Sequence, residues 1–567
     1  MKKWISLALV LIFLFTLMVG CGKQPQEQPE NETKTSTEAT KPLAGENLMV
    51  ESFDDTDETY DGVKIQLADE GITVDGEAIS ADTSKAVYAA NDIVYYESGK
   101  DFTYGEGTEK DAHTKEEADA HTVVHITKAG QYVLSGKLSK GQIAVDLGED
   151  AEEDPDAVVT LVLDGVDITC EVAPAVIFYN VYECGSKDEE TATKDVDLTA
   201  AGARVILANN SENKVNGSYV ARIYKPGTVE LTEDGTEVAD AKKLHKYDAA
   251  FYSKMSMRIQ GGNKGNGNGK LTIKAANEGL DSELHLTIDG GIIDIESGND
   301  GINTNEDNIS VTTINGGKLS ILVNGSTGEG DGIDSNGWLV INGGIVLAQG
   351  CGFSGDAGID SDKGIHINGG TVVASGNMLD RIEDGGQTHA VFTMGQSRKD
   401  SAIQLRNKDG DIVVSHEITN AYTVLVISSP HMTPGEYTLW DGDTQLQGGA
   451  GQNGGMRPGG MQGGFGERPD DMEIPDGMTV PTGERPDKND GEFPEMQEGM
   501  TRPVGGKNDR EFSVGDITPV FLVNEGANYF QVVSSDEATI KRPGENAAGV
   551  GNGQFAIVEG ANYFTVV

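Results

Sequence analysis

The chain is poor in cysteine, in aromatic residues and in basic residues. Only four cysteines occur in 567 residues, aromatic side chains make up 6%, and 43 Lys and Arg stand against 92 Asp and Glu, a formal net charge of −49. So few cysteines exclude a disulfide framework. The scarcity of basic residues argues against nucleic-acid binding, because there is no basic stripe to neutralise the phosphates. The low aromatic content weakens the case for a platform that stacks on crystalline cellulose. Such an acidic chain suits divalent cations, and partners that are neutral or bridged by those cations.

A short pattern that returns four times organises the middle of the chain. Ile, then Asp or Asn, then two Gly occur at 288–291, 314–317, 341–344 and 367–370, at spacings of 26, 27 and 26 residues. A second marker of the type Gly-Ile-Asp-Ser precedes each tetrad and begins at Gly279, Gly301, Gly332 and Gly358. Each repeat holds three short runs of alternating apolar residues, separated by Gly, Asn and Asp that suit tight turns. Period and turn chemistry predict an all-β fold, a parallel β-helix with three strands per repeat.

Stacking such repeats would align equivalent residues as columns spaced by about 4.8 Å. In the second marker, Ile and Ser are expected to point inward, and the Asp or Asn positions outward. Three outward columns carry carboxylates and amides: Asp281, Asn303, Asp334 and Asp360; Glu283, Asn305, Asn336 and Asp362; and Glu278, Asp300 and Asp331, which Ala357 interrupts. Neighbouring carboxylates repel one another, and mixed oxygen ligands suit Ca²⁺. We therefore predict bound calcium at these columns. The alternative is that Asp and Asn only serve as turn and ladder residues.

The N-terminal residues are typical of an exported lipoprotein. Residues 1–20 combine two lysines with an apolar stretch, which indicates a signal peptide. The sequence Leu-Met-Val-Gly-Cys at 17–21 resembles a bacterial lipobox and makes Cys21 the expected lipidation site; a plain signal peptide or a membrane helix is the alternative. The lipidated cysteine and a tether rich in Gln, Pro, Glu and Thr would occupy residues 21–47. The expected location is extracytoplasmic, at the cell surface and held to the membrane by acyl chains.

Four further segments are expected from composition and strand patterning. Residues 48–121 contain short strand patterns and a charged loop and predict an N-terminal β cap, because the open end of a solenoid exposes unpaired strand edges. The β-helix is expected over 122–445, and a Gly-, Met-, Pro- and Glu-rich linker over 446–510. A C-terminal β extension over 511–567 is built on a duplicated Glu-Gly-Ala-Asn-Tyr-Phe motif. Cys170 and Cys184 either pair or are buried thiols.

Several motifs within 122–445 resemble one protein family. The runs are Ile-Thr-Lys-Ala-Gly-Gln-Tyr-Val-Leu-Ser-Gly at 126–136, Leu-Val-Leu-Asp-Gly-Val-Asp-Ile-Thr at 161–169, Val-Ile-Ser-Ser-Pro at 426–430 and Tyr-Thr-Leu at 437–439. Together with the Asp-Gly-Ile and Ile-Asn-Gly-Gly repeats, they are similar to bacterial surface proteins described as carbohydrate-binding-domain-containing. The charged insertions at 183–197 and 228–246 depart from that family's pattern and leave the lateral shape of the early repeats open.

The resemblance implies a right-handed parallel β-helix related in shape to pectate lyases, with bound calcium. It also implies binding of cellulose and of acidic pectic polymers without catalytic activity. Joined to the acidic columns and the lipobox, it favours calcium-dependent, non-catalytic polysaccharide binding at the bacterial cell surface.

A pectate-type lyase on the same scaffold is the first alternative, and a structural surface protein or adhesin is the second. A lyase needs a basic side chain near Ca²⁺ to remove a proton beside a uronate carboxylate. Lys363 and Arg381 are candidates for that base, although both also suit a solvated surface. For sugar contact, His285 and Trp338 share an outward column three residues before the tetrads, where rings can stack on sugar faces.

The lipobox makes a direct prediction about Cys21. Metabolic labelling with a palmitate analogue should mark the native protein and fail on the Cys21→Ser variant, because the thioether-linked diacylglycerol needs this sulfur. Equal labelling of both proteins would show that the lipid does not depend on Cys21.

Overall fold

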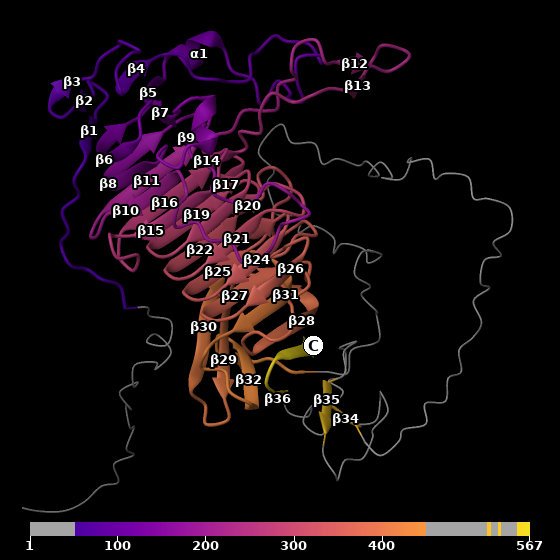
Figure 1. Ribbon diagram of the computed structural model, residues 1–567. Helices are drawn as coiled ribbons and strands as arrows, with labels where there is room; N and C mark the ends of the chain where they lie inside the picture. Colours follow the sequence, from indigo (N-terminus) through magenta and orange to yellow (C-terminus); the bar gives the residue numbers. More distant parts are fainter. Residues whose placement is uncertain (1–51, 449–518, 523–530, 535–552, 567) are drawn as a thin grey trace, which may run out of the picture. The chain divides into compact units, whose positions relative to one another are not determined.

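The computed structural model describes residues 52–448, 519–522, 531–534 and 553–566, and in these ranges the regular structure is almost entirely β (Figure 1). The helical elements there are one five-residue α-helix, α1 (Lys115–Asp119), and a 3₁₀ helix at Glu149–Glu153. No helix within the same ranges is long and apolar enough to cross a membrane. The all-β class expected from the sequence is confirmed. The predicted segments 1–20 and 21–47, and residues 449–510 of the predicted linker, lie outside the described residues.

The first described strands attach to the start of two sheets. They are β1 (Val63–Leu67), β2 (Thr73–Val74), β3 (Glu77–Ala78) and β4 (Val87–Ala90). β1 pairs in parallel with β6 (Gly130–Leu138), and β4 pairs antiparallel with β5 (Thr122–Ile126). The charged loop expected before residue 122 contains α1, whose N-terminus carries a capping box between Thr114 and Glu117.

Between β5 and β27, most strands form three series in which each strand pairs in parallel with its equivalent one repeat further along (Figure 1). The first series is β5, β7 (Gly141–Val145), β9 (Val176–Phe178), β14 (Ala249–Ser253), β17 (Glu278–Ser282), β20 (Ile302–Thr304) and β23 (Ile333–Ser335). The second runs from β8 (Val159–Thr169) through β10 (Ala203–Leu207), β15 (Met257–Gly261), β18 (His285–Ile288), β21 (Val311–Ile314) and β24 (Trp338–Ile341) to β26 (Gly364–Ile367). The third also starts at β8 and continues through β11 (Glu212–Gly217), β16 (Lys270–Ala275), β19 (Ile292–Ser297), β22 (Lys318–Val323) and β25 (Ile345–Gln349) to β27 (Thr371–Gly376).

The repeated tetrad forms the turn between the second and third series. Its Asx residues stack as a ladder: Asn315 Nδ2 donates to Asp289 Oδ1 over 2.8 Å, Asn342 to Asn315 over 2.9 Å, and Asn368 to Asn342 over 2.8 Å. The last glycine of each tetrad has a positive φ between 79° and 94°, a conformation that a side chain would strain. The tetrad therefore fixes both the bend and the spacing of successive repeats.

Parallel pairing ends at β27, and the sheets that follow are mixed. β28 (His389–Arg398) and β31 (Tyr422–Ser428) pair antiparallel, and β31 also closes antiparallel on β27. β29 (Ser401–Asn407), β30 (Ile412–Ile418), β32 (Gly435–Asp441) and β33 (Thr444–Gln445) form a further antiparallel sheet. The prediction of one parallel β-helix over residues 122–445 is therefore not confirmed, and the strands after β27 contradict it. Alternating apolar residues do not distinguish parallel from antiparallel partners.

The C-terminal copy of the duplicated motif is docked. β36 (Phe555–Ile557) pairs antiparallel with β32, and β37 (Ala561–Val566) pairs in parallel with β28, where Phe564 stacks on Phe392. The other described strands form two antiparallel pairs, β12 (Glu230–Leu231) with β13 (Val238–Asp240) and β34 (Pro519–Leu522) with β35 (Gln531–Ser534). Cys170, Cys184 and Cys351 are free thiols, which answers the question of a Cys170–Cys184 pair.

Candidate functional site

The first strand series places the predicted columns side by side. Asp281 of β17 pairs with Asn303 of β20, and Asn303 pairs with Asp334 of β23. Asp360 extends the column, because its N–H donates to the carbonyl of Ile333 over 2.7 Å. The intervening residues Leu280, Ile302 and Ile333 are buried in the hydrophobic core, so carboxylates and core residues alternate across the strands as period two requires.

The carboxylates of the early repeats are not open to solvent, and here the expectation of outward exposed columns is wrong. Asp281 is 0% exposed, Glu278 6% and Asp300 9%, and the amides of Asn303 and Asn305 are buried with them. Asp331, Asp334 and Asp360 of the later repeats are partly exposed, and Asp362 is exposed. The acidic columns are therefore covered at one end and accessible at the other.

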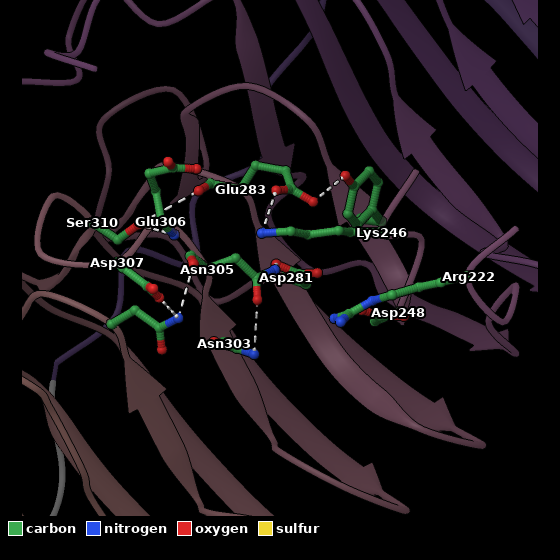
Figure 2. A network of polar contacts seen from close by, with 12 residues as sticks. Arg222, Lys246, Asp248, Asp281, Glu283, Asn303, Asn305, Glu306, Asp307 and Ser310 are labelled. Atoms are coloured by element: carbon green, nitrogen blue, oxygen red, sulfur yellow. Dashed lines mark hydrogen bonds and ion pairs between the residues drawn. The ribbon is translucent and has the colours of Figure 1, made fainter. Parts of the chain in front are cut away.

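The contacts at the covered end come from Lys246 at the end of the 228–246 insertion, from Asp248 just after it and from Tyr252 of β14. Lys246 Nζ lies 3.6 Å from Glu283 Oε2, and the hydroxyl of Tyr252 donates to Glu283 Oε1 over 2.6 Å (Figure 2). Asp248 accepts from the backbone N–H of Glu278 through its carbonyl over 3.1 Å, while its carboxylate pairs with Arg222 over 2.9 Å. Sequence reasoning did not include Asp248 among the site residues, because the segment before β14 has no periodicity to place it.

Three residues of the covered end share an unusual deficit of hydrogen bonds. Asn303 Nδ2 donates to Glu278 Oε1 over 3.3 Å and to Asn305 Oδ1 over 3.2 Å, and Asn305 Nδ2 donates to Asp281 Oδ1 over 2.8 Å. The remaining oxygens, Glu278 Oε2, Asp281 Oδ2 and Asn303 Oδ1, are buried without any hydrogen-bond partner. We call these three residues the oxygen cluster. An unsatisfied buried polar atom costs about 1–3 kcal/mol, and more if charged, so three together call for an explanation.

Burial and mutual repulsion raise the pKa of nearly every carboxyl in the columns. Desolvation is the larger cause, followed by neighbouring carboxylates. The pKa values of Glu278, Asp281 and Asp331 lie well above the ordinary range, and those of Asp300, Asp334 and Asp360 rise to about 7. The pKa of Glu283 is also raised by burial, although Tyr252 and Lys246 oppose that shift. Without a cation, these groups therefore retain protons near neutral pH that ordinary Asp and Glu have lost.

The donor set of the oxygen cluster fits a calcium ion in its chemistry. Carboxylate and amide oxygens are the side-chain ligands that Ca²⁺ prefers, and each member of the cluster has one oxygen unused by the protein. Within the described ranges, no group of three or more His, Cys, Asp or Glu side chains is arranged to hold a metal ion. A calcium site here would therefore draw on the amide oxygens of Asn303 and Asn305 as well as on carboxylates.

The two basic candidates of the lyase alternative are placed together at the end of the columns. Lys363 Nζ lies 4.7 Å from the ring centroid of Trp338, a cation–π contact. Arg381 donates to the backbone carbonyl of Lys363 over 2.9 Å and forms an ion pair with Glu383. Both cations are thus held in contacts of their own, and neither has an ion pair to the column carboxylates among the contacts described.

Of the two rings predicted to contact sugar, the structure leaves only one at the surface. His285 and Trp338 do share a column, through Val311 between them. His285 is 1% exposed, because the loop at Gly185 packs on its ring, and burial lowers its pKa to about 4. Its assignment to sugar stacking is therefore wrong. Trp338 is partly exposed, and Lys363 lies over its ring.

Comparisons with known proteins agree with the resemblance found in the sequence. Residues 118–390 match the model of a family described as carbohydrate-binding domain-containing protein. A protein of that description from Acetivibrio thermocellus is 32% identical over 175 residues, which cover 31% of this chain and 45% of the relative. The chain thus spans less than half of that relative's length. Among solved structures, a gadolinium derivative of a polysaccharide lyase-like protein from C. thermocellum is similar at 21% identity and a TM-score of 0.30, over 54% of this chain and 92% of that one. Similarity to carbohydrate-binding-domain-containing proteins therefore covers the region with the acidic columns, and the relation in shape to pectate lyases stays a prediction.

The raised pKa values predict how stability without calcium depends on pH. Folded carboxyls with a pKa of about 7 bind more protons than the unfolded chain, whose Asp pKa is about 3.9, so stability falls as pH rises from about 4 to about 7. In chelator, the unfolding midpoint should therefore rise when pH is lowered from about 7.5 to about 5.5. The Asp334→Asn, Asp360→Asn double variant should show a flatter dependence. A midpoint that is constant or falls on acidification would contradict the assignment.

Proposed function

We propose that this chain is a calcium-dependent, non-catalytic polysaccharide-binding protein of the bacterial cell surface. The observation that carries the proposal is the oxygen cluster, with three buried oxygens that no donor among the described residues satisfies. Similarity to carbohydrate-binding-domain-containing proteins over 118–390 supports the binding of a polysaccharide.

The two ends of the columns suit different roles for calcium. At the covered end, Glu278, Asp281, Asn303 and Asn305 would hold an ion that stabilises the fold, since little solvent reaches them. At the accessible end, the partly exposed Asp334 and Asp360 leave room for ligands from outside the protein. A cation there would keep coordination positions for the carboxylate of a uronate. A chain with a net charge of −49 would otherwise repel such a polymer.

The scaffold of the proposal is a right-handed parallel β-helix over the repeats that precede β28. Three series of parallel strands, each paired one repeat apart, support this arrangement. The stacked Asx ladder at every tetrad supports it too, because such ladders need equivalent turns in register. The lipid anchor at Cys21, which would hold this scaffold at the cell surface, belongs to the proposal on the evidence of the lipobox alone.

The lyase alternative has less support from the described contacts. In the described contacts, Lys363 lies over Trp338, and Arg381 is engaged by the backbone carbonyl of Lys363 and by Glu383. Release of unsaturated uronides, which absorb ultraviolet light, would identify a lyase. We expect no such product from the purified protein.

Calcium is expected to raise the unfolding midpoint of the native protein. A ligand that binds only the folded state adds about 2.7 kcal/mol when present at about 100 times its Kd. Asp281→Asn keeps the size of the side chain but removes a charge from the oxygen cluster, so it should reduce the calcium-induced shift without lowering the midpoint in chelator. Asp294→Asn, in an exposed pair with Lys270, is the matched control and should retain the full shift. Equal calcium shifts in the two variants would place the ion elsewhere.

Binding of polygalacturonate should require both calcium and the accessible carboxylates. Affinity electrophoresis should show retardation of the native protein with calcium and none with chelator, because the anionic polymer needs a bridging cation. The Asp334→Ala, Asp360→Ala double variant should lose retardation while it keeps the calcium-induced rise in unfolding midpoint that the covered end supplies. Retardation that persists in chelator, or in this variant, would rule out the bridge.

A further inference from the structure

A hollow lies outside the acidic columns, at the ends of four strands of the third series. It has a volume of about 360 Å³ and is lined by residues of β8, β11, β16 and β19, of the turns after the first three of these strands, and by Asn324 after β22. This volume falls within the range of small-molecule sites, about 300–1,000 Å³. We call it the strand-end pocket; its polar lining includes Thr169, Glu171, Asn216, Lys274 and Glu296.

Small residues make the floor of the strand-end pocket. Gly217 pairs with Ala275, and Ser218 and Ala276 follow them. A Cβ added at Gly217 would lie 2.6 Å from the Cα of Ala250, so the backbone here is packed too closely to admit any side chain.

Polar side chains cross this floor in a row, one from each strand. Asn216 is in register with Thr169 on one side and with Lys274 on the other, and Lys274 is in register with Glu296. Asn216 Nδ2 donates to Thr169 Oγ1 over 3.1 Å, and Lys274 Nζ donates to Glu296 Oε2 over 2.8 Å. Donors and acceptors therefore repeat at the strand spacing of about 4.8 Å, which is close to the length of one sugar unit in an extended glycan.

The charges of the lining are balanced, unlike those of the columns. Glu296 pairs with Lys274, and Glu171 pairs with Lys140 over 3.0 Å. A uronate polymer would gain no net attraction here, and the lining offers no unused oxygen cluster for a bridging cation among the buried atoms described. Hydroxyl groups, which both donate and accept hydrogen bonds, match a row of amide, ammonium and carboxylate groups.

We infer that the strand-end pocket binds a neutral glycan chain, laid across the strands with successive sugar units over Thr169, Asn216, Lys274 and Glu296. This inference rests on the proposed polysaccharide-binding function and adds a site to it. The protein would then hold two chemically different glycans at separate places, an acidic one through calcium at the columns and a neutral one through hydrogen bonds at the pocket.

The test uses cellohexaose as probe, with isothermal titration of the full chain in calcium. Removing two polar side chains of the row with Lys274→Ala, Glu296→Ala should weaken binding about thirtyfold, since the hydrogen bonds of both side chains are lost and thirtyfold corresponds to about 2 kcal/mol. Filling the floor with Ala276→Trp is an independent variant at an exposed position and should weaken binding at least as much. Lys270→Ala, Asp294→Ala removes the other ion pair between β16 and β19, outside the pocket, and should bind like the native protein.

The outcomes separate this inference from the proposed function. If the native protein binds cellohexaose and both pocket variants bind it equally well, the pocket is not the site, while polysaccharide binding itself stands. If the native protein binds neither cellohexaose nor calcium-bridged polygalacturonate, the proposed function fails and this inference fails with it. Loss of cellohexaose binding in both pocket variants, with polygalacturonate binding retained, supports two separate sites.

Discussion

Repulsion between carboxylates that are stacked at the strand spacing and withdrawn from water is the constraint on which the central repeats depend. Two such charges about 4.8 Å apart repel by about 3.5 kcal/mol at an effective dielectric constant of about 20. The parallel register gives them no freedom to separate, because the same strands carry the core residues Leu280, Ile302 and Ile333 on their other face. Protons or cations must therefore relieve the repulsion. The raised pKa values correspond to relief by protons, and the unpartnered oxygens of the oxygen cluster favour relief by a cation.

The repeats and the segment before β14 contribute differently to the acidic columns. The repeats supply register, and the Asx ladder holds it from one turn to the next. The segment before β14 supplies Lys246 and Asp248, whose contacts with Glu283 and Glu278 cover the early repeats. Because that cover does not extend to Asp334 and Asp360, one set of repeats combines a protected end, suited to a structural ion, with an accessible end, suited to a ligand.

The sequence predicted the columns and the inward or outward sense of their residues, because a spacing of 26 or 27 residues and a period of two determine both. It did not predict burial. The contacts of Lys246 with Glu283 and the packing of Gly185 on His285 come from insertions with no repeat, so nothing in the pattern places them. The change to antiparallel pairing after β27 was missed for another reason: strands such as β28 and β31 alternate in the same way whichever direction their partner runs. The strand-end pocket was missed because its lining comes from four strands of successive repeats, which no local signal brings together.

The most direct test of the account is the number of protons released when calcium binds. Titration of calcium into the apoprotein near neutral pH, in two buffers of different ionisation enthalpy, gives that number. If calcium replaces protons on Asp300, Asp334 and Asp360, whose pKa values are about 7, binding must release protons, and the release must decline as the pH is raised above those values. Calcium binding without proton release at neutral pH, or no calcium binding at all, would contradict the account.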